Sequence, residues 1–412
     1  MQSKATETVR SVNALTADWA RIAVREGDRP GQGTVFSAAG VWPLLALLAG
    51  GAHGPARGEL HGALGIADAH SATALGRQVI EALQAMDGVD AATGLWTRAE
   101  LPVRPVWRSW LPDGVHGTLT GDAERDRAEL DAWAARHTQG RITTMPVPLR
   151  PDLMLVLAGA LLIRTTWTTP FNEGWLMPRH GAWEGRRLGG LFRSTGELDQ
   201  VRLAPHTPAG PLTLAEVRGD NGLDVHLLLG DEGVPGGKVL EAGVAVLDGD
   251  HATLPGSALD YGTPGPGLTV ADVIGWDERP KLNVATPAFT VRAEHDLLQN
   301  AGLFGLLTAV DGSQGHFPGI STVPLAISSG RQSMTAGFSA KGFEAAAVTA
   351  FALAAAGVPQ RRSKQVGACF DRPFGFLAVH RASGLVLAAG WVTDPDEAPD
   401  PSGPGLGPGL GW

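Results

Sequence analysis

Acidic, histidine and cysteine side chains occur in three places where their types could support chemistry. Residues 248–253, DGDHAT, combine two carboxylates with an imidazole, but they lack the spacing of a calcium loop, and their turn-forming residues favour a hairpin turn. His380 could partner Asp371 or Ser383, and hydrogen bonding at the end of a strand is the expected role. Cys369 has no neighbouring motif that would lower the pKa of its thiol, so we expect a buried, unreactive cysteine.

The usual catalytic motifs are absent from the sequence. There is no H-E-x-x-H helix, no Walker phosphate loop and no G-x-S-x-G nucleophile turn, and the 12 histidines are not paired at metal-ligand spacing. We therefore expect a protein that is not an enzyme and that uses no cofactor and no metal. A net charge of −9 argues against nucleic acid as the main partner.

The sequence also limits the cellular setting. A single cysteine excludes an intrachain disulfide. The first twenty residues lack the apolar region of a signal peptide, and the longest apolar stretch, LMLVLAGALLI at 153–163, is too short to span a bilayer. We expect no membrane association and a cytoplasmic location, with the compartment otherwise unassigned. Arginine far outnumbers lysine, which is typical of a bacterium with GC-rich codons.

Helices are predicted mainly in the first third of the chain. Residues 41–50 place apolar side chains at helical spacing and end at two glycines, and residues 56–66 form a second short pattern. Residues 122–137 are amphipathic and end before Gly140. Strands are expected afterwards, which predicts an α+β fold and not a repeated βαβ unit.

Several segments have the composition of strands. The β-branched residues after 153–163 favour a long buried strand there, and short apolar runs between turns predict strands at 212–219, 223–230 and 243–250. Residues 281–295 form another candidate strand. A hairpin is expected from 374–382 and 384–392.

The domain organisation follows from the lack of an interior linker. Length alone would allow two or three domains. Because no Pro- or Gly-rich linker divides the chain before residue 392, residues 1–392 are expected to form a single domain. Residues 393–412 are rich in proline and glycine and are predicted to be a disordered tail.

Six ordered segments resemble the serpin family. VFSAAGVWPLLALLAGG resembles its second helix, LDAWAARHTQGRI the helix that crosses its main sheet, and LVLAGALLIRTTWTTPF a long strand of that sheet. PAFTVRAEHDL and GLFGLLTAVDGSQGHFPGIS match the next strand and helix, GFEAAAVTA the hinge of the reactive-centre loop, and DRPFGFLAVHRASGLVLAAGWV the terminal hairpin. The resemblance covers nearly the whole chain in order.

This resemblance implies a fold with about nine helices around three β-sheets and an exposed reactive-centre loop. It implies inhibition of a serine protease as a suicide substrate: the protease cuts the loop, and the cut loop inserts as a new strand into the large sheet. The alternative is a non-inhibitory serpin that acts as a binding or chaperone-like protein. A monomer is expected in either case.

The implied hinge of the loop is small and able to form a strand. It comprises six residues, Gly342, Phe343, Glu344, Ala345, Ala346 and Ala347. In a strand, Phe343 and every second residue after it would face one side, and the other set is small apart from Glu344. The first proline is Pro359, so the amides before it can all join a ladder.

The resemblance also identifies support positions and departures from the family pattern. Trp167 matches the breach tryptophan, Ser37 the serine at the helix start in the shutter, and Gln332 the position of the shutter histidine. Phe343 stands where inhibitory members usually have a small residue, so its bulk would slow insertion. Three further differences are Ala340 in place of an acid, Gly159 in place of an asparagine and Ala38 in place of a proline.

The position of the attacked bond depends on how the residues are counted. Counting from the hinge glycine reaches Ala356-Gly357, which favours elastase-like or subtilisin-like proteases with small or apolar pockets. Counting back from the terminal hairpin reaches Arg362-Ser363, which would suit trypsin-like proteases. Ala356-Gly357 is preferred, because trapping depends on the length between the hinge and the cut.

Overall fold

The computed structural model describes residues 2–24, 33–66, 69–150, 152–275, 278–343 and 361–398. Within these ranges there are seven α-helices and four short 3₁₀ helices, where about nine helices were expected. The α-helices are α1 (Gln2–Ala23), α2 (Ala38–Ala49), α3 (Gly54–Leu64), α4 (Ala69–Ala85), α5 (Pro105–Trp110), α6 (Ala123–His137) and α7 (Gly236–Leu247). The 3₁₀ helices are η1 (Gly181–Trp183), η2 (Leu198–Gln200), η3 (Gly256–Ala258) and η4 (Leu297–Asn300).

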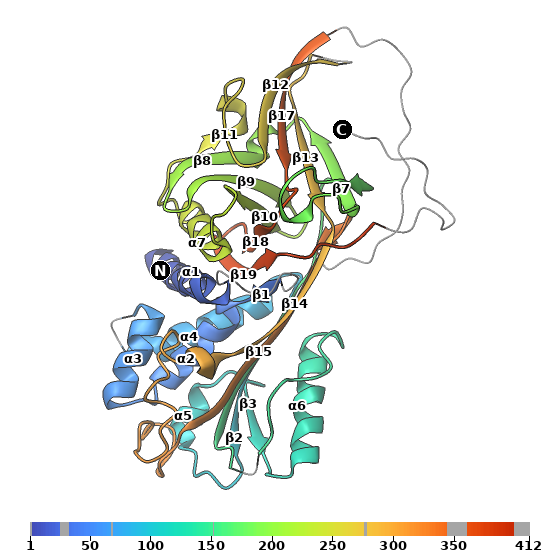
Figure 1. Cartoon of the computed structure of the whole chain (residues 1–412). Helices are drawn as coiled ribbons and strands as arrows, with labels where there is room; N and C mark the ends of the chain where they lie inside the picture. The colour runs from blue at the N-terminus through green and yellow to red at the C-terminus, as the bar shows by residue number, and fades with distance from the viewer. Residues whose placement is uncertain are drawn as a thin grey trace.

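Three β-sheets form the body of the molecule, as predicted (Figure 1). The sheet that carries the hinge, called the hinge sheet below, has the order β3 (His116–Leu119), β2 (Val89–Arg98), β4 (Leu155–Ile163), β15 (Ile327–Phe338), β16 (Gly342–Phe343) and β5 (Thr165–Thr166), with β14 (Phe289–Asp296) on the other edge of β15. The α+β architecture is therefore confirmed.

The other two sheets lie beyond one end of the hinge sheet (Figure 1). The hairpin sheet has the order β1 (Thr34–Phe36), β19 (Leu385–Val392), β18 (Phe374–His380), β10 (Leu223–Gly230), β9 (Gly210–Arg218), β8 (Val201–Thr207) and β11 (Leu254–Pro255). The loop sheet has the order β12 (Leu268–Gly275), β17 (Arg361–Cys369), β13 (Lys281–Pro287), β7 (Leu188–Thr195) and β6 (Asn172–Leu176). The predicted terminal hairpin is β18–β19.

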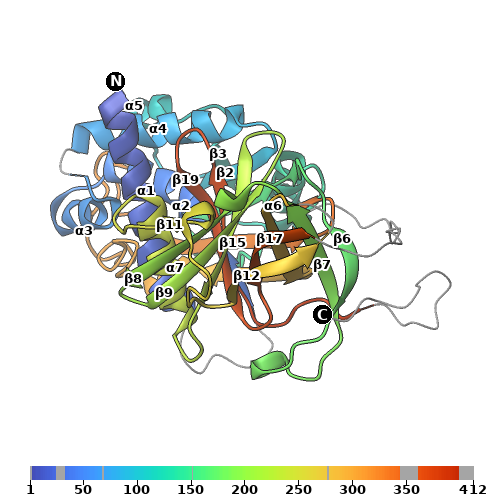
Figure 2. The same ribbon diagram turned by 90° about the horizontal axis from the view of Figure 1, so that it is seen from above.

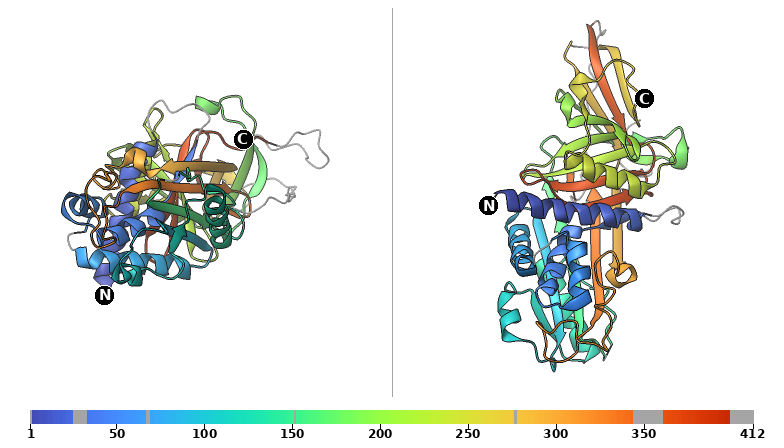
Figure 3. Two further views of the ribbon diagram at one scale, coloured as in Figure 1. Left: turned by 90° about the horizontal axis from the view of Figure 1, so that it is seen from below. Right: turned by 90° about the vertical axis from the view of Figure 1, so that its left-hand side faces the viewer.

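The helices are distributed unequally around these sheets. From above, α1 to α4 gather on one side of the molecule, and β6 and β7 lie on the other (Figure 2). Helix α1 crosses the molecule between α7 and α2 and contacts both (Figure 3). The side chain of Ser37 caps α2, and every residue of α2 is buried, which fits the apolar pattern that predicted this helix.

Strand β4 is covered on both faces. All nine of its residues are buried. Alternate residues, including Leu155 and Leu157, join the main core, and Val156 and Ala158 pack in a smaller cluster with Leu130 of α6. This double coverage explains why the strand reads as an uninterrupted apolar run in the sequence.

The prediction of a strand at 243–250 is wrong, because these residues belong mainly to α7. The apparent alternation around Gly243 comes from a helix that packs closely on a sheet. A Cβ atom at Gly243 would lie 2.3 Å from the side chain of Leu228 in β10. The glycine therefore permits close helix–sheet contact and does not mark a strand. Residues 248–253 consequently form the turn that follows α7, and not a hairpin turn.

Two other boundaries differ from the sequence predictions. Residues 281–295 form two strands in different sheets, β13 and β14, with Pro287 and Ala288 at the junction. The proposed tail at 393–412 is described as far as residue 398. The amide of Gly189 donates to the carbonyl of Asp396, and the amide of Ala398 donates to the carbonyl of Arg187. Residues 393–398 are thus bound to the domain, and 399–412 lie outside the described residues.

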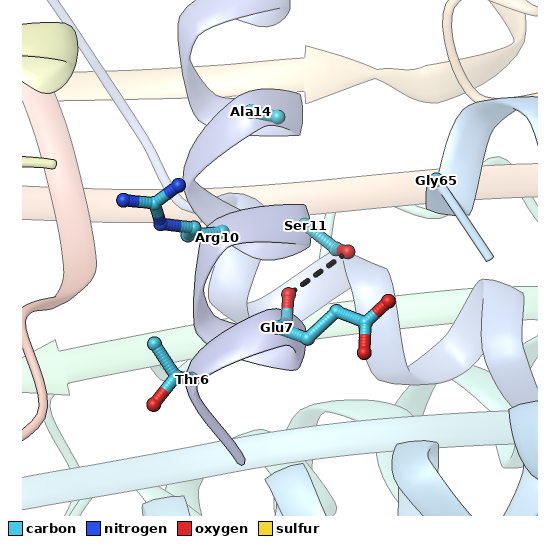
Figure 4. A pocket seen from close by; sticks show the side chains of 6 residues that line it. All are labelled: Thr6, Glu7, Arg10, Ser11, Ala14 and Gly65. Atoms are coloured by element: carbon cyan, nitrogen blue, oxygen red, sulfur yellow. Dashed lines mark hydrogen bonds between the residues drawn. The ribbon is translucent and has the colours of Figure 1, made fainter. Parts of the chain in front are cut away.

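A surface hollow of about 490 Å³ lies along α1 (Figure 4). Within it, the hydroxyl of Ser11 donates to the carbonyl of Glu7, 3.1 Å away, and the guanidinium of Arg10 donates to the carbonyl of Asp248 at 3.2 Å. Most of its lining residues are exposed, so the hollow is open to solvent. The lining residues are Thr6, Glu7, Arg10, Ser11, Ala14 and Gly65.

Candidate functional site at the hinge of the central sheet

Strands β4 and β15 are direct parallel neighbours over most of their length. Seven pairs of residues are in register, from Ile327 opposite Leu155 to Met334 opposite Leu161. Parallel ladders are slightly less stable per residue than antiparallel ones. An antiparallel strand placed between β4 and β15 would therefore replace one parallel ladder with two antiparallel ladders.

Such a strand has begun to form at one end of the pair. Beyond Met334, β16 lies between β15 and β5 and is antiparallel to both. Phe343 is opposite Phe338 on one side and Thr165 on the other. The described part of the hinge, Gly342 and Phe343, is thus already within the hinge sheet, and Glu344, Ala345, Ala346 and Ala347 lie outside the described residues.

Gly342 occupies a position that leaves no room for a side chain. A Cβ atom there would lie 2.2 Å from the carbonyl oxygen of Thr165. Just before it, the amide and the hydroxyl of Ser339 each donate to the carbonyl of Gly342 at 3.0 Å, which closes the tight turn from β15 into β16. The hinge glycine is therefore required by backbone contact with β5.

Phe343 is buried and not held at the surface. Its exposed fraction is 2%, and its ring packs against Phe376 of β18 with ring centroids 5.9 Å apart. The sequence predicted that Phe343 would be a bulky obstacle that enters the sheet first. In this structure the ring has already been accommodated, so its steric cost is met before any further residue inserts.

Trp167 supports the turn that precedes the hinge. Its indole N–H donates to the carbonyl of Ser339 at 2.9 Å, and its backbone amide donates to the carbonyl of Lys341 at 2.8 Å. The indole is almost fully buried and packs on Phe338 with ring centroids 4.9 Å apart. Ala340, in the same turn, is 5% exposed, so the acid that the family usually has there would be buried.

Ser37 and Gln332 are joined midway along the hinge sheet. The amide of Ser37 donates to Oε1 of Gln332 at 2.9 Å, and Nε2 of Gln332 donates to the carbonyl of Ser37 at 2.8 Å. Both residues are almost fully buried. One neutral side chain thus satisfies both polar groups of a buried residue, a pairing that requires a donor and an acceptor on the same amide.

Gly159 and His295 complete this level of the sheet. Gly159 of β4 is directly opposite Gln332, and His295 of β14 is opposite Gln332 on the other edge of β15. Nε2 of His295 lies 3.0 Å from the carbonyl oxygen of Val35, and burial lowers the pKa of the imidazole. Sequence reasoning missed His295, because only the strand register shows that it lies beside Gln332.

The two candidate bonds fall in different parts of the chain. Ala356 and Gly357 lie outside the described residues. Arg362 and Ser363 lie inside β17, where they pair with Ile274 and Val273 of β12. Ser363 is 5% exposed, so the Arg362-Ser363 bond is part of a sheet and not of a loop.

The remaining chemical candidates have structural roles. Nδ1 of His380 lies 2.8 Å from the hydroxyl of Ser383, one of its two expected partners, and Asp371 pairs with Arg372. Burial raises the pKa of the Cys369 thiol to about 12, as expected for an unreactive cysteine. Among the described residues, no group of three or more acidic, histidine or cysteine side chains could hold a metal ion. No helix in the described ranges has both the length and the apolar character needed to cross a membrane.

Comparisons with known proteins place these features in a family context. A family model described as Serpin (serine protease inhibitor) matches residues 11–179 and 267–395. Serpin-Z8 of Oryza sativa subsp. japonica is 29% identical over 39% of this chain and 42% of its own length. Serpin-Z6C of the same plant is 26% identical over 88% of this chain and 91% of its own length. These plant relatives give no support to a bacterial source.

A solved structure shows the same fold. The crystal structure of Serpin48, described as a highly specific serpin in the insect Tenebrio molitor, superposes with a TM-score of 0.70 at 20% sequence identity. The match covers 94% of this chain and 98% of that chain. The arrangement of three sheets and the surrounding helices is therefore shared over the length of the domain.

Proposed function

Because the chain belongs to the serpin family, we propose that it inhibits a serine endopeptidase by suicide-substrate trapping, with insertion of its cut loop into the hinge sheet. Family membership supports protease inhibition in general. The observation that supports the trapping mechanism is β16, which lies antiparallel between β15 and β5 where the parallel β4–β15 pair ends.

The register of β16 can be extended along the sheet. Continuing the Phe343–Phe338 pairing places residue 349 opposite Gln332, and continuing the Phe343–Thr165 pairing places residue 349 opposite Gly159. Gln332 and Gly159 are already partners in the parallel ladder. The two registers therefore agree, and a strand can insert while β4 and β15 only move apart, without sliding past each other.

The extended register also places the large side chains of the loop. Phe351 would lie opposite Gly330, which carries no side chain, and opposite Leu157 on the β4 side. About ten new hydrogen bonds at about 1 kcal/mol each, with about 2 kcal/mol for each of Phe351 and Leu353, give a gain on the order of 10 kcal/mol. This gain is comparable to the stability of a whole domain.

The chemical step would be acyl transfer. The protease serine Oγ attacks the carbonyl carbon of Ala356 and forms an ester, the bond to the Gly357 nitrogen breaks, and the nitrogen leaves as an amine after taking up a proton. The chain is then free at Ala356 and tethered at Gly342, so it can pass between β4 and β15. Insertion would carry the acylated protease along the sheet before water hydrolyses the ester.

The attacked bond is best assigned to Ala356-Gly357. The alternative, Arg362-Ser363, pairs with β12, and β17 also pairs with β13 from Gln365 onward. A protease could reach Arg362-Ser363 only by separating paired strands. Alanine before the cut favours an elastase-like or subtilisin-like protease, and trypsin-like enzymes are the alternative partner. The inhibitor is proposed to act as a monomer without a cofactor.

Denaturing gels test this proposal. The protein is incubated with pancreatic elastase, subtilisin and trypsin at near-equimolar ratio, and an ester-linked complex should appear with elastase or subtilisin. Ala356→Arg should transfer complex formation to trypsin, and Arg362→Ala should leave the elastase complex unchanged. Clean cleavage without any covalent complex would reject trapping and would favour the non-inhibitory alternative.

A further inference from the structure

Strands β12 and β17 form a two-stranded ribbon that projects from the loop sheet (Figure 1). Strand β13 pairs with β17 only from Gln365 onward, so residues 361–364 pair with β12 alone. Two strands with no further partner are marginally stable in water. Contact with a second molecule would therefore be favourable at this ribbon.

The tip of the ribbon is apolar and locally neutral in charge. Ile274 is 55% exposed and Val273 is 37% exposed, and they are cross-strand partners of Arg362 and Ser363. The guanidinium of Arg362 lies 3.0 Å from the carboxylate of Asp272, and that of Arg361 lies 3.4 Å from Glu278. Because each arginine has an acidic partner, the exposed apolar groups are the unsatisfied part of this surface.

The tip is also close to the proposed cut. Four residue steps separate Arg361 from Gly357, so their Cα atoms are at most about 14 Å apart. A protease domain of roughly 230 residues has a radius of gyration of about 17 Å. A protease bound at Ala356-Gly357 must therefore extend over the ribbon tip.

We propose that the ribbon tip, formed by Val273 and Ile274 with Arg361 and Arg362 beside them, is a second docking surface for the serine protease. This inference rests on the proposed function, because the protease is brought to the tip by the loop. The contact is apolar, and its contribution to affinity is insensitive to salt. It also helps to select proteases with an apolar rim on the side of the substrate that follows the cut.

Rate and affinity measurements with pancreatic elastase test the docking surface. Ile274→Thr keeps β-branching and removes most of the apolar character, so it should lower the second-order rate constant of complex formation about five-fold. It should also weaken binding of elastase whose catalytic serine is replaced by alanine, by a similar factor. The ratio of variant to parent should be the same in 50 mM and 500 mM salt.

Two controls separate this proposal from the one on which it rests. Leu307→Thr changes another exposed apolar residue, 62% exposed, and should leave the rate constant unchanged. Ile274→Thr should keep the parent's denaturation temperature and stoichiometry of inhibition. If the parent forms a covalent complex and Ile274→Thr forms it at the parental rate, the docking surface is rejected and trapping stands. If the parent forms no complex, trapping itself is rejected.

Discussion

The ring of Phe343 in β16 packs 5.9 Å from the ring of Phe376 in β18, so the hinge is anchored in the core between the hinge sheet and the hairpin sheet. The residue that should be small in an inhibitory serpin is therefore large here and already in place. Insertion would start from residue 344 and not from the bulky residue. Phe343 then stabilises the uncut protein and does not obstruct the trap.

Replacing Phe343 should lower stability without improving inhibition. Phe343→Thr restores the usual small residue but leaves a cavity beside Phe376, and the free energy of unfolding should fall by about 3 kcal/mol. Urea denaturation measures this loss. Val323→Thr, at a site that is 43% exposed, is the matched control and should change little. A variant as stable as the parent, with stoichiometry of inhibition closer to one, would show that Phe343 is an obstacle.

A side chain at Gly342 should displace the hinge. The Cβ of Gly342→Ala would lie 2.2 Å from a backbone oxygen of Thr165, and a backbone atom cannot move aside like a flexible side chain. We expect a loss of about 1–3 kcal/mol and faster proteolysis of the chain after residue 342. Gly196→Ala is the control, because a Cβ atom there meets nothing within 4 Å. Equal proteolysis rates for both variants would contradict the observed position of β16.

The amide of Gln332 should be needed for both of its hydrogen bonds. Gln332→Glu keeps the shape but removes the donor to the Ser37 carbonyl, which leaves a buried acceptor facing an acceptor. The urea midpoint should fall markedly at pH 7 and recover partly in acid, where the carboxyl becomes a donor. Gln365→Glu is the control, because the oxygen of Gln365 accepts from Asn283 and a carboxylate retains that role. Matching losses in the two variants would argue against a special role for Gln332.

His226 should make the fold sensitive to acid. Burial lowers the pKa of His226 to about 4, which is well below its value in the unfolded chain. Between about pH 6.5 and 4 the unfolded state binds the proton and the folded state does not, so stability falls as pH falls through this window. The loss is on the order of 3 kcal/mol.

Comparing two histidine variants isolates this effect. His226→Leu should flatten the decline in urea stability between pH 7 and pH 4.5, whereas His380→Gln, at a more exposed site, should leave most of the decline in place. A decline of the same size in His226→Leu would mean that other groups cause the acid sensitivity.

The sequence predicts those parts of the fold in which local pattern and burial agree. Strand β4 is apolar throughout because both of its faces are covered, and α2 is capped by Ser37 as its pattern implies. The strand prediction at 243–250 failed because Gly243 interrupts the helical pattern for a tertiary reason, the close approach of Leu228. No local signal in the chain carries that contact.

The candidate site was predictable in its residues but not in its geometry. Gly342, Trp167, Ser37 and Gln332 were found by position in the family pattern, and the structure shows which groups each of them contacts. His295 could not be found, because its place beside Gln332 depends on the β14–β15 register. The burial of Phe343 likewise depends on Phe376, which is far away in the sequence.

Thermal denaturation of the cut protein tests the central claim most directly. Elastase or subtilisin is used to cut at Ala356-Gly357, the cut is verified by the mass of the 357–412 fragment, and the denaturation temperature is compared with that of the intact protein. Insertion of 344–356 between β4 and β15 would add on the order of 10 kcal/mol, so the cut protein should denature at least about 10 °C higher. A cut protein that denatures at the same temperature as the intact one, or lower, would contradict the account.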